Sequence, residues 1–266
     1  MEPVRPEFVP DPSLSQSEME ELQRDIADAA RFEDDLAVSP DRIGDAPTDA
    51  EQATLGATSE GGETPVVAGV DQAFVGDRAV SAIVVLQGGE VIERVHAVER
   101  TEIPYIPGLL SFREGGAILA AFAELSYDPD VVLVDGSGRI HFREAGLATH
   151  IGVTLDVPTV GVAKSLLCGT PDRSLDEKYP VGTRIPIDAD ESVETCADGT
   201  CIGHAVQTRQ YDSPNRHINP LIVSPGHRVG ASTAADLVTA TTEGYKLPEP
   251  TRLADRYADE AKASVE

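Results

Sequence analysis

The sequence has little lysine, little cysteine and no long apolar run. Four of its 21 basic residues are lysine, against 46 acidic residues, and the net charge is -25. A carboxylate-rich surface stays hydrated in concentrated salt, where the Debye length falls to about 3 Å at 1 M. Because the hydrophobic content is an ordinary 41%, this composition favours adaptation to high intracellular salt over a role as the acidic partner of a basic protein. It also counts against nucleic-acid binding, where phosphate contacts supply most of the affinity, unless metal ions and a few arginines carry those contacts.

The few cysteines exclude a disulfide framework. Cys168, Cys196 and Cys201 form no paired pattern and indicate a reducing compartment. Cys196 and Cys201, with His204 nearby, are either a zinc site or free thiols, and the loose spacing without a second pair favours free thiols. No apolar run approaches the roughly 18 residues that span a bilayer, and the acidic start is not a secretory signal. We therefore expect a cytoplasmic protein that makes no membrane contact.

Composition and periodicity divide the chain into five segments. Ser15, followed three residues later by Glu18, is a capping box that predicts the start of an amphipathic helix. The segments are an unstructured proline-rich start (1–12), the amphipathic helix (13–38), a flexible acidic linker (39–64), a catalytic domain (65–245) and a polar C-terminal helix or tail (246–266).

The core pattern predicts an α/β fold. Three strands in hairpin order, with Gly88 and Gly89 between the second and third, precede an alternation of strands and helices, which indicates a mixed sheet covered by helices. The expected elements are strands at 66–71, 79–86 and 91–98, a helix at 111–125, a strand at 131–135, a helix at 144–155, strands at 158–163, 205–211 and 221–227, and a helix from 232.

Three acidic residues occupy positions where open α/β sheets place their chemistry. Asp135 ends the buried strand 131–135, Asp71 lies on the first strand, and Glu114 lies in the first turn of the helix at 111–125. If these elements share one sheet, the three carboxylates converge at one edge. Oxygen ligands suit Mg²⁺, and two such ions can promote phosphodiester hydrolysis.

Each acid also has a purely structural interpretation. Asp71 and Asp135 can be polar residues at strand ends and turns. Glu114 completes the pattern of a capping box with Ser111, which makes helix capping an alternative role.

Several other residues have both a structural and a functional interpretation. His141, His150 and His227 can be hydrogen-bonded structural histidines or catalytic ones. Lys164 ends an apolar strand in a lysine-poor chain, which favours a phosphate contact. The rigid segment 104–108 is either a turn packed on the core or a wedge that fills the space left by an extruded base.

Six motifs in order resemble those of endonuclease V, the deoxyinosine 3′ endonuclease. The match extends over about residues 65–240, and six motifs in sequence are far more specific than one. The motifs are 69–71 (GVD), 104–114 (PYIPGLLSFRE), 134–138 (VDGSG), 146–153 (GLATHIGV), 158–165 (PTVGVAKS) and 223–228 (VSPGHR).

The resemblance implies a ribonuclease H-like fold and cleavage of damaged DNA, single- or double-stranded. The expected reaction is magnesium-dependent hydrolysis, with Mn²⁺ as a possible substitute, of the second phosphodiester bond 3′ to deoxyinosine. It leaves a nick with a 5′-phosphate for other repair enzymes. By the same likeness Asp71, Glu114 and Asp135 bind metal, His227 supports the metal site and Lys164 approaches the phosphate.

The resemblance also implies a DNA-contacting set around a pocket that reads the flipped hypoxanthine. These residues are the wedge Pro104, Tyr105, Ile106 and Pro107, the neighbouring Arg113 and His141, and Gly136, Gly138 and His150. We expect a monomer. Inosine-containing RNA is an alternative substrate, and a non-catalytic protein that binds the lesion is an alternative of another class.

Overall fold

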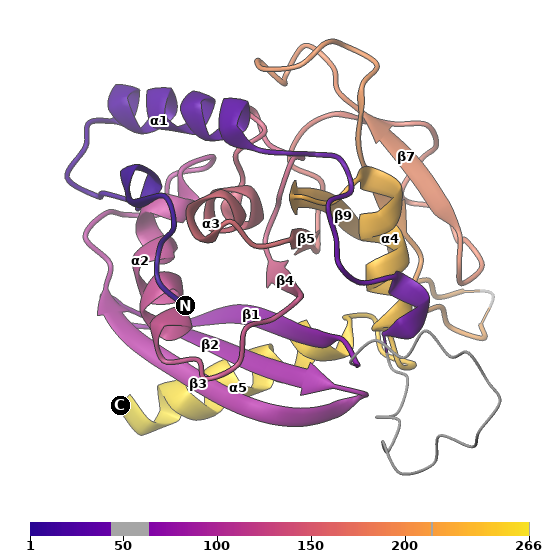
Figure 1. Cartoon of the computed structure of the whole chain (residues 1–266). Helices are drawn as coiled ribbons and strands as arrows, with labels where there is room; N and C mark the ends of the chain where they lie inside the picture. Colours follow the sequence, from indigo (N-terminus) through magenta and orange to yellow (C-terminus); the bar gives the residue numbers. More distant parts are fainter. Residues whose placement is uncertain (44–63, 214, 266) are drawn as a thin grey trace, which may run out of the picture.

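The computed structural model describes residues 1–43, 64–213 and 215–265. A nine-stranded mixed sheet, in the order β3-β2-β1-β4-β5-β9-β8-β7-β6, carries helices on both faces (Figure 1). The strands are β1 Val66–Val75, β2 Arg78–Gln87, β3 Glu90–Arg100, β4 Val131–Asp135, β5 Thr159–Ala163, β6 Thr170–Pro171, β7 Arg184–Asp188, β8 Cys201–Val206 and β9 Leu221–His227. The helices are η1 Pro6–Phe8, α1 Gln16–Ala29, η2 Pro40–Arg42, α2 Leu110–Ala123, α3 Leu147–Leu155, α4 Ala231–Ala240 and α5 Glu249–Val265.

The predicted mixed sheet is confirmed. Strands β1, β2 and β3 form an antiparallel meander, whereas β4 pairs in parallel with β1, and β5 in parallel with β4. Strand β9 runs antiparallel to β5, so that His227 pairs with Thr159 at the start of β5. This last direction decides which residues of β9 can reach the carboxyl ends of β4 and β5.

The central strands are buried on both faces, as the run of apolar residues at 131–134 predicts. Val132 and Val134 pack toward α2 and α3. Val131 and Leu133 pack toward α4 on the opposite face. Helix α5 lies on that same opposite face against β1 and β2 (Figure 1). Asp135, the next residue along β4, is thus delivered to the end of a strand held rigidly between two helical layers.

The two chain ends are more ordered than the sequence suggests. Residues 1–12, expected to be unstructured, pack on α3, where the backbone N–H groups of Val4 and Arg5 donate to the Thr154 carbonyl at 3.0 and 3.1 Å. Helix α1 has the predicted capping box but ends at Ala29, well before residue 38. The C-terminal helix is docked through the buried Ala254 and Ala258. Most of the predicted acidic linker, residues 44–63, lies outside the described residues.

Across the described ranges, none of the helices combines the length and the apolar character needed to cross a bilayer.

Candidate active site

Four carboxyl groups meet at the carboxyl end of β4, beside the middle of β1. Asp71 and Asp135 follow the paired residues Val70 and Val134 on adjacent parallel strands. Glu114 comes from α2 on one face of the sheet. Asp255 comes from α5 on the other face and hydrogen-bonds with the side chain of Asp71. The structure therefore brings together the three predicted acids and adds a fourth.

The carboxyl groups are crowded and poorly solvated. Asp71 is 8% exposed and Glu114 is 5% exposed. Burial, reinforced by the neighbouring charge of Asp135 and by Asp255, raises the pKa of Asp71 to about 8. Burial also raises the pKa of Glu114 to about 7, with Arg113 opposing and Asp135 reinforcing the rise. Asp71 and Glu114 therefore hold their protons to a higher pH than ordinary carboxyl groups do, because the surrounding fold stabilises their negative charge poorly.

Lys164 supplies a positive charge at this edge. Its Nζ donates to Oδ2 of Asp135 at 2.8 Å, and its side chain is 57% exposed. Partial burial opposes the charge of Lys164, but the hydrogen bond to Asp135 and the fields of Asp71 and Asp255 outweigh it and raise the pKa of the lysine. The one lysine that ends an apolar strand is thus a fixed cation facing solvent beside the acids.

The helix-capping interpretation of Glu114 is wrong. The N-cap of α2 is Leu109, and no side chain caps the helix. Ser111 lies inside the first turn, and its buried hydroxyl has no hydrogen-bond partner. Glu114 is consequently free to turn toward Asp135, with which it interacts electrostatically.

The donor set fits a hard divalent cation. Carboxylate oxygens are the ligands that Mg²⁺ prefers, and the raised pKa values of Asp71 and Glu114 show that positive charge would be favoured here. As the side chains stand, no three His, Cys, Asp or Glu groups of the described residues are arranged around a common point as in a metal site. The Lys164 ammonium holds one oxygen of Asp135, so ion binding would require these side chains to turn toward each other.

Asp255 is the residue that sequence reasoning missed. It lies on a polar helix, beside the buried stripe of Thr251, Ala254 and Ala258 that faces the sheet. The available signal was an acidic residue at helical spacing next to that small-residue stripe. The helix's docking against β1 brings the carboxyl group to Asp71.

His227 does not lie with the carboxyl groups, which corrects its expected role in supporting a metal site. It is fully buried beside the start of β5, where Nε2 contacts Oδ1 of Asp156 at 3.0 Å and Nδ1 accepts from the Arg31 backbone N–H at 3.2 Å. Because β9 is antiparallel to β5, its last residue lies at the opposite end of the sheet from Asp135. His227 is a structural histidine that ties the segment after α1 to β9.

A pocket opens beside the carboxyl groups, between α2 and the loop before α3. It encloses about 380 Å³ of space, part of it open to solvent. Tyr105 stands at this pocket with its side chain 63% exposed, as a wedge would. His141 lines the pocket and bonds through Nε2 to the Gly108 carbonyl at 3.0 Å. From α1, the buried Gln23 donates to the same carbonyl at 2.7 Å.

The neighbouring wedge residues follow Tyr105 on the same loop. Pro104 and Pro107 are exposed and Ile106 is half-buried. Arg113, on α2, lies with its guanidinium 4.6 Å from the centre of the Phe74 ring. Ile106 packs against the core and the other wedge residues face solvent. The wedge role of this loop stays a prediction.

Two glycines shape the backbone after β4. Gly136 has a φ of 154°, a conformation that side-chain-bearing residues rarely adopt. A Cβ at Gly138 would lie 2.3 Å from the Pro225 carbonyl oxygen. The tight backbone therefore depends on both glycines.

His150 is not placed to touch DNA, which corrects the expectation for this residue. It is fully buried, its Nε2 lies 2.7 Å from the Phe8 carbonyl oxygen, and its ring packs edge-on against Phe112. Burial lowers the pKa of His150 to about 4, so the ring is neutral at pH 7. The residue anchors the N-terminal segment on α3.

A family model described as Endonuclease V matches residues 50–256. An Endonuclease V from the halophile Haloarcula marismortui is 81% identical over 268 residues, covering 99% of this chain and 98% of that protein. The chain belongs to the Endonuclease V family.

Solved Endonuclease V structures share the fold. The Bacillus subtilis structure is 26% identical with a TM-score of 0.75, covering 100% of this chain and 98% of that one. The Ciona intestinalis structure is 24% identical with a TM-score of 0.67, covering 94% of this chain and 98% of that one. The likeness confirms the ribonuclease H-like arrangement that the motifs implied.

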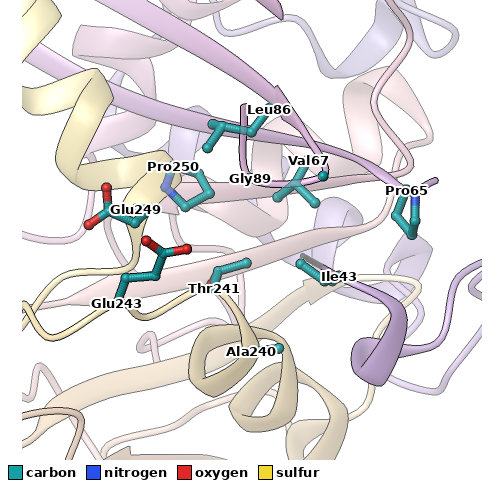
Figure 2. A pocket seen from close by; sticks show the side chains of 11 residues that line it. Ile43, Pro65, Val67, Leu86, Gly89, Ala240, Thr241, Glu243, Glu249 and Pro250 are labelled. Atoms are coloured by element: carbon teal, nitrogen blue, oxygen red, sulfur yellow. The ribbon is translucent and has the colours of Figure 1, made fainter. Parts of the chain in front are cut away.

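A second cavity lies away from the Endonuclease V carboxyl cluster (Figure 2). It is lined by Val67 and Leu86, near the start of β1 and the end of β2, by Thr241 at the end of α4, and by Pro250 in the first turn of α5. Asp71 is four residues further along β1, or about 13 Å at the rise of a strand. This cavity is therefore not part of the site.

The three cysteines are free thiols. Cys168 is buried, and Cys196 and Cys201 are half-buried. Burial raises the pKa of Cys168 to about 12 and that of Cys196 to about 11, so neither is a thiolate at neutral pH.

Proposed function

We propose that this chain is a DNA repair endonuclease that hydrolyses the second phosphodiester bond 3′ to deoxyinosine in a magnesium-dependent reaction. The observation that carries the proposal is a cluster of four carboxyl groups and one lysine next to a pocket with an exposed tyrosine at its side. Membership of the Endonuclease V family supports the same reaction. The Ciona intestinalis relative was crystallised with a 24-mer DNA containing an inosine.

Asp71, Asp135, Glu114 and Asp255 would hold the divalent cations. Bound there, the ions would activate water and stabilise the leaving oxygen. The carboxylates must be deprotonated for this, and the raised pKa values of Asp71 and Glu114 mean that protons compete for the same oxygens near neutral pH.

Side chains of the protein would position the DNA backbone and accept the proton of the attacking water. Lys164, fixed against Asp135, would contact a non-bridging oxygen of the scissile phosphate and offset its charge in the transition state. The carboxylates would accept the proton of the attacking water. As the new bond to phosphorus forms, the bond to the 3′ oxygen breaks. This oxygen takes a proton from solvent water, and the products are a 3′-hydroxyl and a 5′-phosphate.

The pocket would receive the lesion base. Tyr105 would fill the gap that a base leaves in the stack when it is extruded. Hypoxanthine carries a keto oxygen and a ring N–H where adenine carries an amino group and a ring acceptor, so polar groups of the pocket can separate the two. Burial and the nearby charge of Arg143 lower the pKa of His141 to about 4, so its ring is neutral. It would hold the wedge loop through its bond to Gly108.

The test is cleavage of an end-labelled duplex with one deoxyinosine, with and without MgCl₂ and with MnCl₂, mapping the break. We expect one magnesium-dependent nick at the second bond 3′ to the lesion and none in the undamaged duplex. Asp135→Asn should abolish it, whereas Asn at the exposed Asp128 should not. Unchanged nicking by the Asp135 variant would refute the catalytic assignment. If only an inosine RNA of the same sequence is cleaved, RNA and not DNA is the substrate. Tight binding without cleavage would indicate a non-catalytic binding protein.

The cytoplasmic location and the monomeric state stay predictions.

A further inference from the structure

The hydroxyl group of Ser111 is buried without a use in the fold. Ser111 is 2% exposed, and its Oγ has no hydrogen-bond partner. An unpaired buried hydroxyl lowers the stability of the folded chain, because it gives up its bonds to water without replacement. The sequence offered one structural role, the capping of α2 together with Glu114, and that role is absent because the helix begins at Leu110 and has no side-chain cap.

Ser111 also lines the pocket beside Tyr105. Two other polar side chains that face the pocket, one on α1 and one in the loop before α3, already have partners. Gln23 donates to the Gly108 carbonyl and accepts from Nε of Arg143, and His141 contacts the same carbonyl. Among the pocket-lining side chains in the described residues, Ser111 alone has a buried polar atom without a partner.

We propose that the Ser111 hydroxyl reads the base, by a hydrogen bond to the edge of hypoxanthine formed by the 6-keto oxygen and the N1–H group. This inference rests on the proposed function and names a specificity residue within it. A serine hydroxyl can donate one bond and accept two, so it can serve either group of that edge. Base binding would supply the partner that the folded protein lacks.

The same geometry predicts a selective loss. A site built to bond a polar group discriminates against an analogue that lacks it, because the protein group is then left unpaired. Purine, the base of deoxynebularine, has neither the keto oxygen nor the N1–H of hypoxanthine. Removing the hydroxyl should therefore weaken recognition of deoxyinosine and leave that of deoxynebularine nearly unchanged.

The experiment compares kcat/KM of the wild-type protein and Ser111→Ala on duplexes that differ only in deoxyinosine or deoxynebularine. We expect Ser111→Ala to lower kcat/KM for deoxyinosine about three- to tenfold, the range of one neutral hydrogen bond. The deoxynebularine value should change less than about twofold on the same grounds. The melting temperature should stay equal or rise, because the variant removes an unsatisfied group.

Ser81→Ala is the matched control. Ser81 is fully buried on β2, its hydroxyl also has no partner, and it does not line the pocket. Ser81→Ala should leave the ratio of kcat/KM for deoxyinosine to kcat/KM for deoxynebularine unchanged. No loss in Ser111→Ala, or an equal loss on both substrates, would overturn the inference. If the wild-type protein does not cleave deoxyinosine DNA, the proposed function itself fails, and that result is visible before any variant is compared.

Discussion

Replacing Asp71 by asparagine should stabilise the metal-free protein while it abolishes cleavage. Asp71 is 8% exposed, and burial raises its pKa from the ordinary value of 3.8 to about 8. The folded chain therefore holds the Asp71 proton more tightly than the unfolded chain does. Without a cation, the contribution of Asp71 to stability is complete below about pH 4 and is lost as pH rises toward 8.

The size of the effect follows from the pKa difference. Each pH unit between 3.8 and 7 contributes about 1.4 kcal/mol, which sets a ceiling of about 4 kcal/mol at pH 7. The ammonium of Lys164 offsets part of the negative charge, and the partial exposure of this edge lets water screen more of it. We therefore expect Asp71→Asn to gain about 2 kcal/mol, or about 4 to 8 °C in melting temperature.

The assay is thermal unfolding in EDTA and high KCl at several pH values from 5 to about 9, spanning the pKa of Asp71. The stabilisation by Asp71→Asn should grow with pH, and Asn at the exposed Asp128 should show no such trend. Added MgCl₂ should stabilise the wild-type protein by about 2.7 kcal/mol at 100 times its Kd, and the variant much less. A lower metal-free melting temperature at pH 8, or a difference independent of pH, would refute the reasoning.

Three further substitutions distinguish residues needed for cleavage from residues that stabilise the fold, and high salt tests the role of the acidic surface. Lys164→Met should cut the cleavage rate at least about 100-fold with a stability change below about 1 kcal/mol, because its bond to Asp135 is solvent-exposed; single-turnover kinetics and melting curves test this. Gln23→Leu should cost about 1 to 3 kcal/mol by denaturant unfolding and weaken deoxyinosine binding, since it leaves Nε of Arg143 without its acceptor and the Gly108 carbonyl with His141 alone. His227→Leu should cost about 1 to 3 kcal/mol yet keep kcat, and a lost kcat in folded protein would restore its catalytic role. Fold and nicking should survive about 1 M KCl, and their loss above physiological salt would refute salt adaptation.

Much of the site could be predicted because it depends on local patterns. A buried strand stopped by glycine places Asp135 at a strand end, and the hairpin pattern before it places Asp71 on a neighbouring strand. These two positions needed only the order and length of the strands. The role of Glu114 was harder to predict, because Ser111 and Glu114 also have the spacing of a capping box. Only the observed start of α2 at Leu110 decided between the two roles.

The incorrect or missing site predictions depend on the direction of a strand and on the docking of a helix. His227 ends an apolar strand just as Asp135 does, and the sequence does not state that β9 runs antiparallel to β5, which sends the two residues to opposite ends of the sheet. Asp255 lies beside a stripe of small residues on a polar helix, and that stripe does not specify which strands the helix docks against.

The sequence by itself determined the apolar strands, the acids at their ends, the order of the motifs and the acidic surface, because each is set by residues adjacent in the chain. The tertiary structure decided which acids share one edge, that Ser111 lines a pocket and that His150 and His227 are structural. These depend on strand direction and helix docking, which are settled by contacts between residues far apart in the chain, where a local pattern carries no information.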